Sequence, residues 1–323
     1  MINIIGGSGF IGKNIQDKLI EENINFCILD QRKGSETKDI FFKKCDVTNK
    51  DDLNNSIDEN SILINLAAEH KDNVFPISKY YEVNVEGAKN ICQAAESKNV
   101  KQIIFTSTVA VYGFAEDYTD ENGKINPFND YGKSKFEAEK VYENWQKKDP
   151  ENRSLVIIRP TAVFGEENRG NVFNLLKQIN SKNFIMIGDG NNKKSIAYVR
   201  NVADFIIFAI KFNSGIHIYN YIDKPDLTMN ELVSLAQNEL SIKPFLKFKL
   251  PYFIAIFIGI LFDLLSKILS KEMIVSSIRI KKFCSNSLFN SSISSSGFIP
   301  RHNLQDALKK TIKHEFKKNR ELV

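Results

Sequence analysis

The chain has 323 residues, enough for one large α/β domain or for a large domain with a smaller appendage. Hydrophobic residues make up 42% and charged residues 26% of the chain, a composition that excludes wholesale disorder. The net charge is +5, and basic and acidic residues are interspersed along most of the sequence. Because no nucleic-acid-binding motif is present, we expect no nucleic-acid partner.

The cysteines and the N-terminus indicate the compartment. Cys27, Cys45, Cys92 and Cys284 lie far apart, form no C-x-x-C pair and share no metal-type spacing with the four histidines, so we expect no metal site. The opening "MINIIGGSG" enters a strand at once and lacks the charged and apolar regions of a secretory signal. These features predict a cytoplasmic protein in a reducing environment.

In the first half of the chain, short β-rich runs alternate with helical patterns. We expect strands at residues 2–5, 25–29, 40–45, 62–67, 102–107 and 154–159. Helices are expected between them at residues 11–22, 50–57, 78–98 and 131–147. Near-continuous apolar strands separated by helices predict a doubly wound parallel sheet of the Rossmann type.

The second half is predicted to be mainly helical. We expect helices at residues 171–181, 200–212, 228–240, 251–269 and 303–317. The pattern favours a dinucleotide-binding domain over residues 1–165, which also carries the candidate catalytic residues. A smaller substrate-binding region would follow over 166–323, and the chain could return to the main sheet around 184–222.

One apolar segment stands out in this second half. Residues 251–262 form an unbroken apolar run, which Asp263 and Lys267 end before it reaches the length of a membrane span. We interpret residues 250–269 as a helix that is buried or that covers the substrate. Peripheral membrane association through this segment is the less favoured alternative.

A glycine-rich loop follows the first strand. The stretch "GGSGFIG" places Gly6, Gly9 and Gly12 between that strand and an amphipathic helix. Glycines at these positions allow a tight turn and let backbone amides approach a pyrophosphate at the helix N-terminus. The order of strand, loop, helix and second strand predicts a dinucleotide site.

Two acidic residues further on refine this prediction. Asp30 ends the second strand, where a carboxylate can bind both hydroxyls of an adenosine ribose, which favours NAD. Arg32 and Lys33 lie close by and could accept a 2′-phosphate, so NADP remains an alternative. Asp46 can bind the adenine edge, but it could instead cap the next helix, as could Thr48.

A candidate catalytic set follows the fifth strand. "TSTVAVYG" delivers Ser107 and Thr108 at a strand C-terminus, the sheet edge where ligands bind in open α/β folds. Tyr131 and Lys135 are four residues apart and share a helix face. Because a nearby ammonium favours the phenolate, this pair can remove a proton from an alcohol as hydride leaves.

These motifs together resemble the extended short-chain dehydrogenase/reductase family, and within it the nucleotide-sugar epimerases and dehydratases. The motifs occur in family order: "GGSGFIG", Asp30, "DVT", "NLAA", "VNVEGAKN", "TSTVAVYG", "YGKSK" and "RPTAVFG". The resemblance implies that Tyr131 is the acid/base, that Thr108 binds the substrate oxygen, and that Lys135 holds the nicotinamide ribose. It further implies cofactor contacts at Phe10, Ile11, Val47, Leu66, Ala67, Ala68 and Pro160.

Substrate contacts are also carried over from the resemblance. Ser107 neighbours Thr108 and could take its role. Asn171 opens the segment that receives a nucleotide diphosphate in the family, although it could be a simple helix cap. The pair Lys194-Ser195 stands where the family often has arginine-aspartate, so Lys193, Lys194 or Arg200 would neutralise the diphosphate.

The function implied is NAD-dependent epimerisation at C4 of a UDP-hexose or UDP-N-acetylhexosamine. An alternative is a 4-ketoreductase of a UDP-4-keto-6-deoxy-hexosamine in surface-polysaccharide synthesis, which would use the same residues with NADH or NADPH. A lesser alternative is a non-catalytic NAD-binding sensor or scaffold. By resemblance we expect a homodimer, formed by helix 78–98 and the helix that carries Tyr131.

Overall fold

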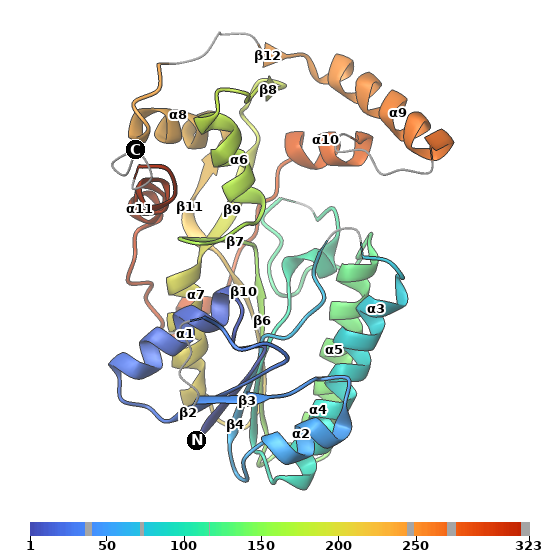
Figure 1. Cartoon of the computed structure of the whole chain (residues 1–323), viewed down its shortest axis with the longest axis vertical. Helices are drawn as coiled ribbons and strands as arrows, with labels where there is room; N and C mark the ends of the chain where they lie inside the picture. The colour runs from blue at the N-terminus through green and yellow to red at the C-terminus, as the bar shows by residue number, and fades with distance from the viewer. Residues whose placement is uncertain (36–40, 72–73, 116, 244–248, 270–275, 318–323) are drawn as a thin grey trace. The chain divides into compact units, whose positions relative to one another are not determined.

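The computed structural model describes residues 1–35, 41–71, 74–115, 117–243, 249–269 and 276–317 (Figure 1). The chain folds into two compact units, each assembled from several segments. Unit 1 comprises Met1–Thr161, Ala197–Ile222 and Asn290–His302. Unit 2 comprises Ala162–Ile196, Asp223–Phe289 and Asn303–Val323.

Unit 1 is built on a seven-stranded sheet in the order β10-β6-β5-β4-β1-β2-β3, in which every pairing is parallel. The strands are β1 Ile2–Ile5, β2 Phe26–Asp30, β3 Phe42–Lys44, β4 Ile62–Asn65, β5 Gln102–Thr106, β6 Ser154–Pro160 and β10 Gly215–Tyr221. Most of the central strands are buried along their whole length, as expected for a parallel sheet covered on both faces. The predicted fold class is confirmed.

Helices cover both faces of this sheet (Figure 1). They are α1 Phe10–Glu21, α2 Lys50–Ser56, α3 Ser78–Tyr81, α4 Gly87–Ser97, α5 Asp130–Lys147 and α7 Val199–Phe208. Helices α2 to α5 lie on one face, while α1 and α7 pack together on the other. The core on the α4–α5 side includes Leu63, Ile103, Ile157, Tyr142 and Trp145.

The helix predicted over residues 78–98 contains an irregular turn. The π-helical segment Glu82–Glu86 joins α3 to α4, so the backbone hydrogen bonds change spacing in the middle of the run. A π-turn of this kind often marks a functional site, because it rotates side chains away from the regular helical stripe. Asn84 lies in this turn and is buried.

Unit 2 combines small sheets with helices. A three-stranded sheet has the order β11-β9-β7, and β12 pairs with β8. These strands are β7 Ala162–Phe164, β8 Met186–Ile187, β9 Lys193–Tyr198, β11 Asp223–Thr228 and β12 Lys249–Leu250. The helices are α6 Asn171–Asn180, α8 Met229–Glu239, α9 Tyr252–Leu269, α10 Ser277–Cys284 and α11 Leu304–Phe316.

Helix α9 differs from the sequence-based expectation. We expected a helix that is buried or that covers the substrate; the face of α9 that does not pack against α10 is exposed. The exposed side chains on it are Tyr252, Phe253, Ile254, Phe257, Ile260, Leu261, Leu264 and Leu265. Burial was expected because a helix that is apolar on every side is normally buried. Among the described residues, no helix has both the length and the apolar character to cross a membrane.

Candidate active site

The glycine loop has the geometry that dinucleotide binding needs. Gly6 has a φ of +73°, and a Cβ there would lie 2.6 Å from the backbone nitrogen of Ala67. A Cβ on Gly12 would lie 2.1 Å from the carbonyl oxygen of Gly7. Gly9 precedes α1, and in the described chain no side chain caps this helix start. The loop therefore stays thin and leads directly into the first turn of α1, opened by Phe10 and Ile11, where backbone N–H groups can bind an anion.

Asp30 is held against this loop. Its carboxylate accepts hydrogen bonds from the backbone N–H of Ser8 at 3.0 Å and of Arg32 at 3.2 Å. Ser8 in turn accepts from the backbone N–H of Gly34 through its hydroxyl at 3.2 Å. The acidic group predicted to bind the adenosine ribose is thus fixed at the carboxyl end of β2, beside the predicted pyrophosphate position.

Asp46 does not cap the following helix, so the capping alternative was wrong for Asp46 and for Thr48. The cap is Asn49, whose side chain accepts from the backbone amides of Asp51 and Asp52. Burial raises the pKa of Asp46, but hydrogen bonds from Thr48 and Gln31 outweigh it and hold that pKa below its ordinary value. Asp46 is therefore a carboxylate available for the adenine edge.

The segment after β4 is fixed by side chains behind it. Asn65 accepts from the backbone N–H of Ala67 at 3.0 Å and donates to the Tyr142 hydroxyl. From the π-turn, Asn84 accepts from the backbone N–H of Glu69 at 2.9 Å and donates to Ser134 on α5 at 2.9 Å. These bonds join the segment that contains Leu66, Ala67 and Ala68 to the helix of the candidate catalytic residues. Val47 packs similarly against Gly87 of α4.

Tyr131 and Lys135 lie in the first turns of α5. Asn129 caps this helix by accepting from the backbone N–H of Gly132 at 3.0 Å. A Cβ on Gly132 would lie 2.6 Å from the carbonyl oxygen of Ala110, so glycine lets α5 approach the segment after β5 closely. The helix start and the strand end are thereby brought together, with Tyr131 only half-buried.

Lys135 is enclosed. Its Nζ donates to the backbone carbonyl of Thr106 at 2.6 Å and lies 4.1 Å from the ring centroid of Phe105. Burial lowers the pKa of Lys135 to about 7, and the carboxylate of Glu139 acts in the opposite direction. The ammonium is therefore fixed at the strand end and can lose its proton near neutral pH.

Thr108 and Ser107 have different surroundings. The Thr108 Oγ1 accepts from the backbone N–H of Ala110 at 3.1 Å, which leaves its own hydroxyl proton to donate. The Ser107 hydroxyl instead donates to the carboxylate of Glu139 and is buried. The geometry therefore favours Thr108 over Ser107 as the hydroxyl that meets a substrate.

A buried ion pair supports this arrangement, and sequence reasoning missed it. Glu139 and Arg159 are joined by two hydrogen bonds of 2.9 and 2.6 Å, with both side chains almost fully buried. Arg159 also donates to the Tyr112 hydroxyl at 2.7 Å. The signal in the sequence was Glu139 itself, four residues beyond Lys135 on the same helix face. Pro160, the next residue on β6, pairs with Tyr221 of β10.

The predicted substrate residues are less directly supported. Asn171 begins α6, but Gly170 is at its cap position, so the capping alternative for Asn171 was wrong. The Nζ of Lys194 donates to the carbonyls of Lys282 at 2.8 Å and Ser285 at 2.6 Å, and burial lowers its pKa to about 8. Lys194 thus holds the end of α10, while Arg200 is exposed in the first turn of α7.

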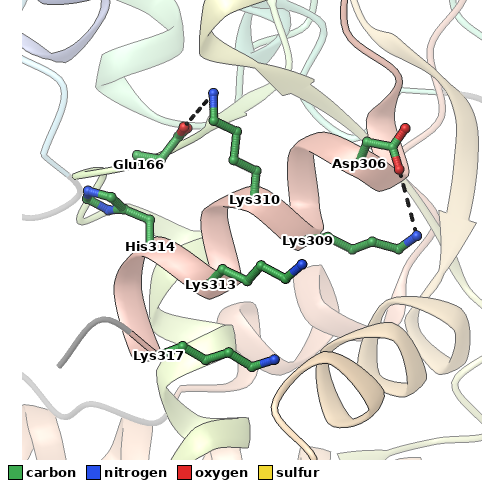
Figure 2. A pocket seen from close by; sticks show the side chains of 7 residues that line it. All are labelled: Glu166, Asp306, Lys309, Lys310, Lys313, His314 and Lys317. Carbon is green, nitrogen blue, oxygen red and sulfur yellow. Dashed lines mark ion pairs between the residues drawn. The ribbon is translucent and has the colours of Figure 1, made fainter. Parts of the chain in front are cut away.

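Two other features of the described residues bear on the location of the site. No group of histidine, cysteine, aspartate or glutamate side chains among them could hold a metal ion. A cavity of about 640 Å³ lies beside α11 in unit 2 (Figure 2). Its lysines are engaged at least in part, since Lys310 pairs with Glu166 at 3.3 Å and Lys309 with Asp306 at 3.7 Å. It contains none of the predicted cofactor or substrate residues.

The parallel sheet, the thin glycine loop and the hydroxyl–tyrosine–lysine set define a dinucleotide-dependent enzyme of the short-chain dehydrogenase/reductase type. The sequence profile described as "NAD dependent epimerase/dehydratase family" matches residues 2–221. The chain belongs to this family. This confirms the family that the sequence motifs resembled, the predicted enzyme class and the NAD cofactor.

A full-length relative gives closer information. The chain is 45% identical, over 315 residues, to N-acetyl-alpha-D-glucosaminyl-diphospho-ditrans,octacis-undecaprenol 4-epimerase of Escherichia coli O157:H7. The alignment covers 97% of this chain and 94% of that protein. The similarity therefore extends through both units, including the segment that forms α9 and α10.

Solved structures agree on the fold. A UDP-glucose 4-epimerase of Thermotoga maritima, solved with UDP-glucose, has a TM-score of 0.76 at 19% identity, with 98% of this chain and 99% of that one covered. A UDP-glucose 4-epimerase of Thermus thermophilus, solved with NAD, has a TM-score of 0.75 at 19% identity, with 97% and 98% covered. At this identity the likeness is one of fold.

Proposed function

We propose that this chain is an NAD-dependent epimerase that inverts C4 of an N-acetylhexosamine linked to a carrier through a diphosphate. The observation that carries the proposal is the placement of Thr108, Tyr131 and Lys135 together at the carboxyl edge of a sheet that also presents the glycine loop. The 45% identity to a 4-epimerase supports the same reaction.

The chain's own residues provide binding, orientation and proton transfer. Bound NAD would supply reversible hydride acceptance at the sugar carbon. Thr108 donates a hydrogen bond to the C4 oxygen and orients it. Tyr131 takes the C4 hydroxyl proton and later returns it, while the Lys135 ammonium stabilises the phenolate. The pyrophosphate of NAD would lie on the loop of Gly6, Gly9 and Gly12.

The carrier is the finer part of the proposal. A UDP-N-acetylhexosamine is the substrate expected from the sequence. A polyprenyl diphosphate is the carrier that we favour, because the full-length relative is named for such a substrate and because α9 exposes an apolar face. The 4-ketoreductase alternative has no comparable support from that relative.

The setting of the reaction is proposed on similar grounds. The four cysteines are free thiols, as expected for the cytoplasmic side of a membrane. We further infer a homodimer through helix 78–98, which comprises α3, the π-turn and α4, and through α5, as the family resemblance implies. The lipid-linked sugar would be presented to the enzyme at the cytoplasmic membrane surface.

The test compares two substrates with purified protein and no added cofactor. UDP-N-acetylglucosamine and N-acetylglucosaminyl diphosphate on a short polyprenyl chain would each be incubated, and NMR of the anomeric signals would follow the C4 epimer. We expect the polyprenyl substrate to reach an equilibrium mixture. Tyr131→Phe should lower turnover by about a hundredfold or more and keep its NAD content, because only proton transfer is removed.

The outcomes separate the candidates. If only UDP-N-acetylglucosamine were turned over, we would conclude that the sugar carrier is the nucleotide and not a polyprenyl diphosphate. No epimer from either substrate, together with oxidation of added NADH by a 4-keto-6-deoxy sugar, would favour the reductase. A protein that holds NAD and converts none of these would contradict the enzymatic proposal.

A further inference from the structure

Helix α9 carries a continuous apolar stripe on its exposed face. Phe253, Phe257, Ile260, Leu261 and Leu264 recur at the spacing that places side chains on one side of a helix. Phe253 is 70% exposed and Phe257 62% exposed. Contiguous apolar surface of this kind marks an interaction site on a protein that is otherwise normally polar outside.

The opposite face of α9 is fixed by α10. Ala255 is buried, and a Cβ on Gly259 would lie 2.8 Å from the Cα of Ser277, so the two helices pack closely. The Asp263 carboxylate accepts from the backbone N–H of Ser277 at 3.2 Å, at the start of α10. This packing sets the rotation of α9, so the exposed stripe is on the side away from α10. Figure 1 shows the two helices next to each other.

The charge around the stripe identifies the kind of partner. Asp263, the acidic residue on α9, lies on the face toward α10, where its carboxylate meets Ser277. Arg279 and Lys281 of α10 are exposed. Basic side chains beside an apolar helix face attract anionic phospholipids. A second copy of this chain would meet the same positive charge, which disfavours self-association through α9.

The packing of α9 against α10 argues that α9 lies on a membrane and does not cross it. The 18 residues of α9 span about 27 Å at the helical rise of 1.5 Å per residue. No helix in the described part of the chain is long and apolar enough to span a bilayer. An apolar face on one side and a protein contact on the other suit a helix that lies in the interface plane.

We infer that α9 and α10 form a docking element for the surface of an anionic phospholipid membrane. The exposed stripe of α9 enters the boundary between headgroups and acyl chains, and the basic side chains of α10 lie at headgroup level. This inference rests on the proposed function, because a sugar on a polyprenyl diphosphate is held at that surface. It adds how the enzyme reaches such a substrate.

The experiment measures vesicle binding by flotation with the full chain. The vesicles would contain phosphatidylethanolamine and phosphatidylglycerol, with pure phosphatidylcholine for comparison. We expect binding to the anionic vesicles that weakens as salt is raised. The double variant Phe257→Asp/Leu261→Asp should bind about tenfold less or weaker still, because two charges would have to enter the apolar boundary.

A matched control places the same change elsewhere. Ile20 and Ile299 are 54% and 82% exposed, outside α9 and α10. Ile20→Asp/Ile299→Asp should therefore float like the wild-type protein. Equal loss of binding in this control would overturn the inference, since surface hydrophobicity in general would then explain the binding.

A second measurement does not depend on a disruptive variant. The chain has a single tryptophan, Trp145, which is buried. Phe253→Trp adds an indole on the stripe, and brominated phospholipid should quench its emission while Trp145 stays unquenched. Absence of quenching with vesicles present would contradict insertion of α9.

The remaining outcomes separate this inference from the proposed function. Wild-type protein that stays unbound to every vesicle overturns the docking element, whatever its activity. A lipid-free dimer that Phe257→Asp/Leu261→Asp converts to a monomer overturns it as well, since the stripe would then be a protein interface. Vesicle binding without epimerisation of either substrate would retain the docking element and refute the proposed reaction.

Discussion

Two effects act on Lys135 in opposite directions: burial disfavours its charged form, whereas its position places that charge in the candidate site. Its side chain is enclosed by the protein, and burial lowers its pKa to about 7, far below the ordinary value for lysine. The same position lets its Nζ lie at the end of β5, four residues beyond Tyr131 on α5. A charged group in such a site is retained for chemistry rather than for stability.

Replacing this lysine should therefore stabilise the protein while abolishing turnover. The unfolded chain keeps the lysine protonated up to its ordinary pKa, whereas the folded chain releases the proton near pH 7. Burial of Lys135 therefore lowers the free energy of unfolding at neutral pH. This loss shrinks as the pH rises toward 10.5, by at most about 1.4 kcal/mol per pH unit. We expect Lys135→Met to unfold at higher urea than wild type at pH 7, with the difference closing by pH 10.

Urea unfolding at both pH values measures this effect, and NMR epimerisation assays measure the turnover. Thr311→Val, at a buried site on α11, is a suitable comparison because no charge changes there. Its effect on stability should be the same at both pH values. A stability difference for Lys135→Met that stays constant with pH would contradict the titration of Lys135 in the folded protein.

At the scale of elements, Gly12 at the start of α1 leaves less room for a Cβ than Gly6 or Gly9 of the same loop. An added Cβ at Gly12 would lie 2.1 Å from the Gly7 carbonyl oxygen, and backbone atoms cannot give way as a flexible side chain can. We expect Gly12→Ala to displace the start of α1, to lower the free energy of unfolding by roughly 2 kcal/mol, and to lose bound NAD.

The cofactor content of the purified protein, measured by absorbance after release, tests this expectation. Gly188→Ala is the control, because Gly188 has a φ of +75° but meets no atom within 4 Å. That variant should cost about 1 kcal/mol of backbone strain and keep its NAD. If Gly12→Ala retained a full complement of NAD, the loop would not be the pyrophosphate site.

The sequence predicted elements better than their partners. The strands of the first half follow from apolar runs, and the Tyr131–Lys135 pair follows from helical spacing. Helical spacing places Glu139 on the same face as Lys135, but its pairing with Arg159 could not be predicted, since it depends on which residue of β6 lies opposite α5. The exposed face of α9 also could not be predicted, because an apolar run does not show which side of the helix packs against the rest of the fold.

At the scale of the whole molecule, α4 and α5 pack side by side on one face of the main sheet. Phe136 of α5 is half-buried and is outside the core cluster of this face, whereas Val83 of the preceding π-turn and Val141 of α5 pack partly against that cluster. Two such helix pairs from two copies of the chain can form a four-helix bundle, in which Phe136 becomes part of the buried centre.

Phe136→Glu should therefore give a monomer at micromolar concentration, because it places a carboxylate at the centre of an apolar contact, where burial of an unpaired charge is costly. Light scattering coupled to size exclusion measures the mass directly. Ile20→Glu, on α1 at the opposite face of the sheet, should leave the dimer intact. Vesicle binding by the Phe136→Glu monomer should persist, because the stripe on α9 does not include Phe136. A wild-type protein that is already a monomer would refute the bundle and would leave each α9 to bind lipid alone.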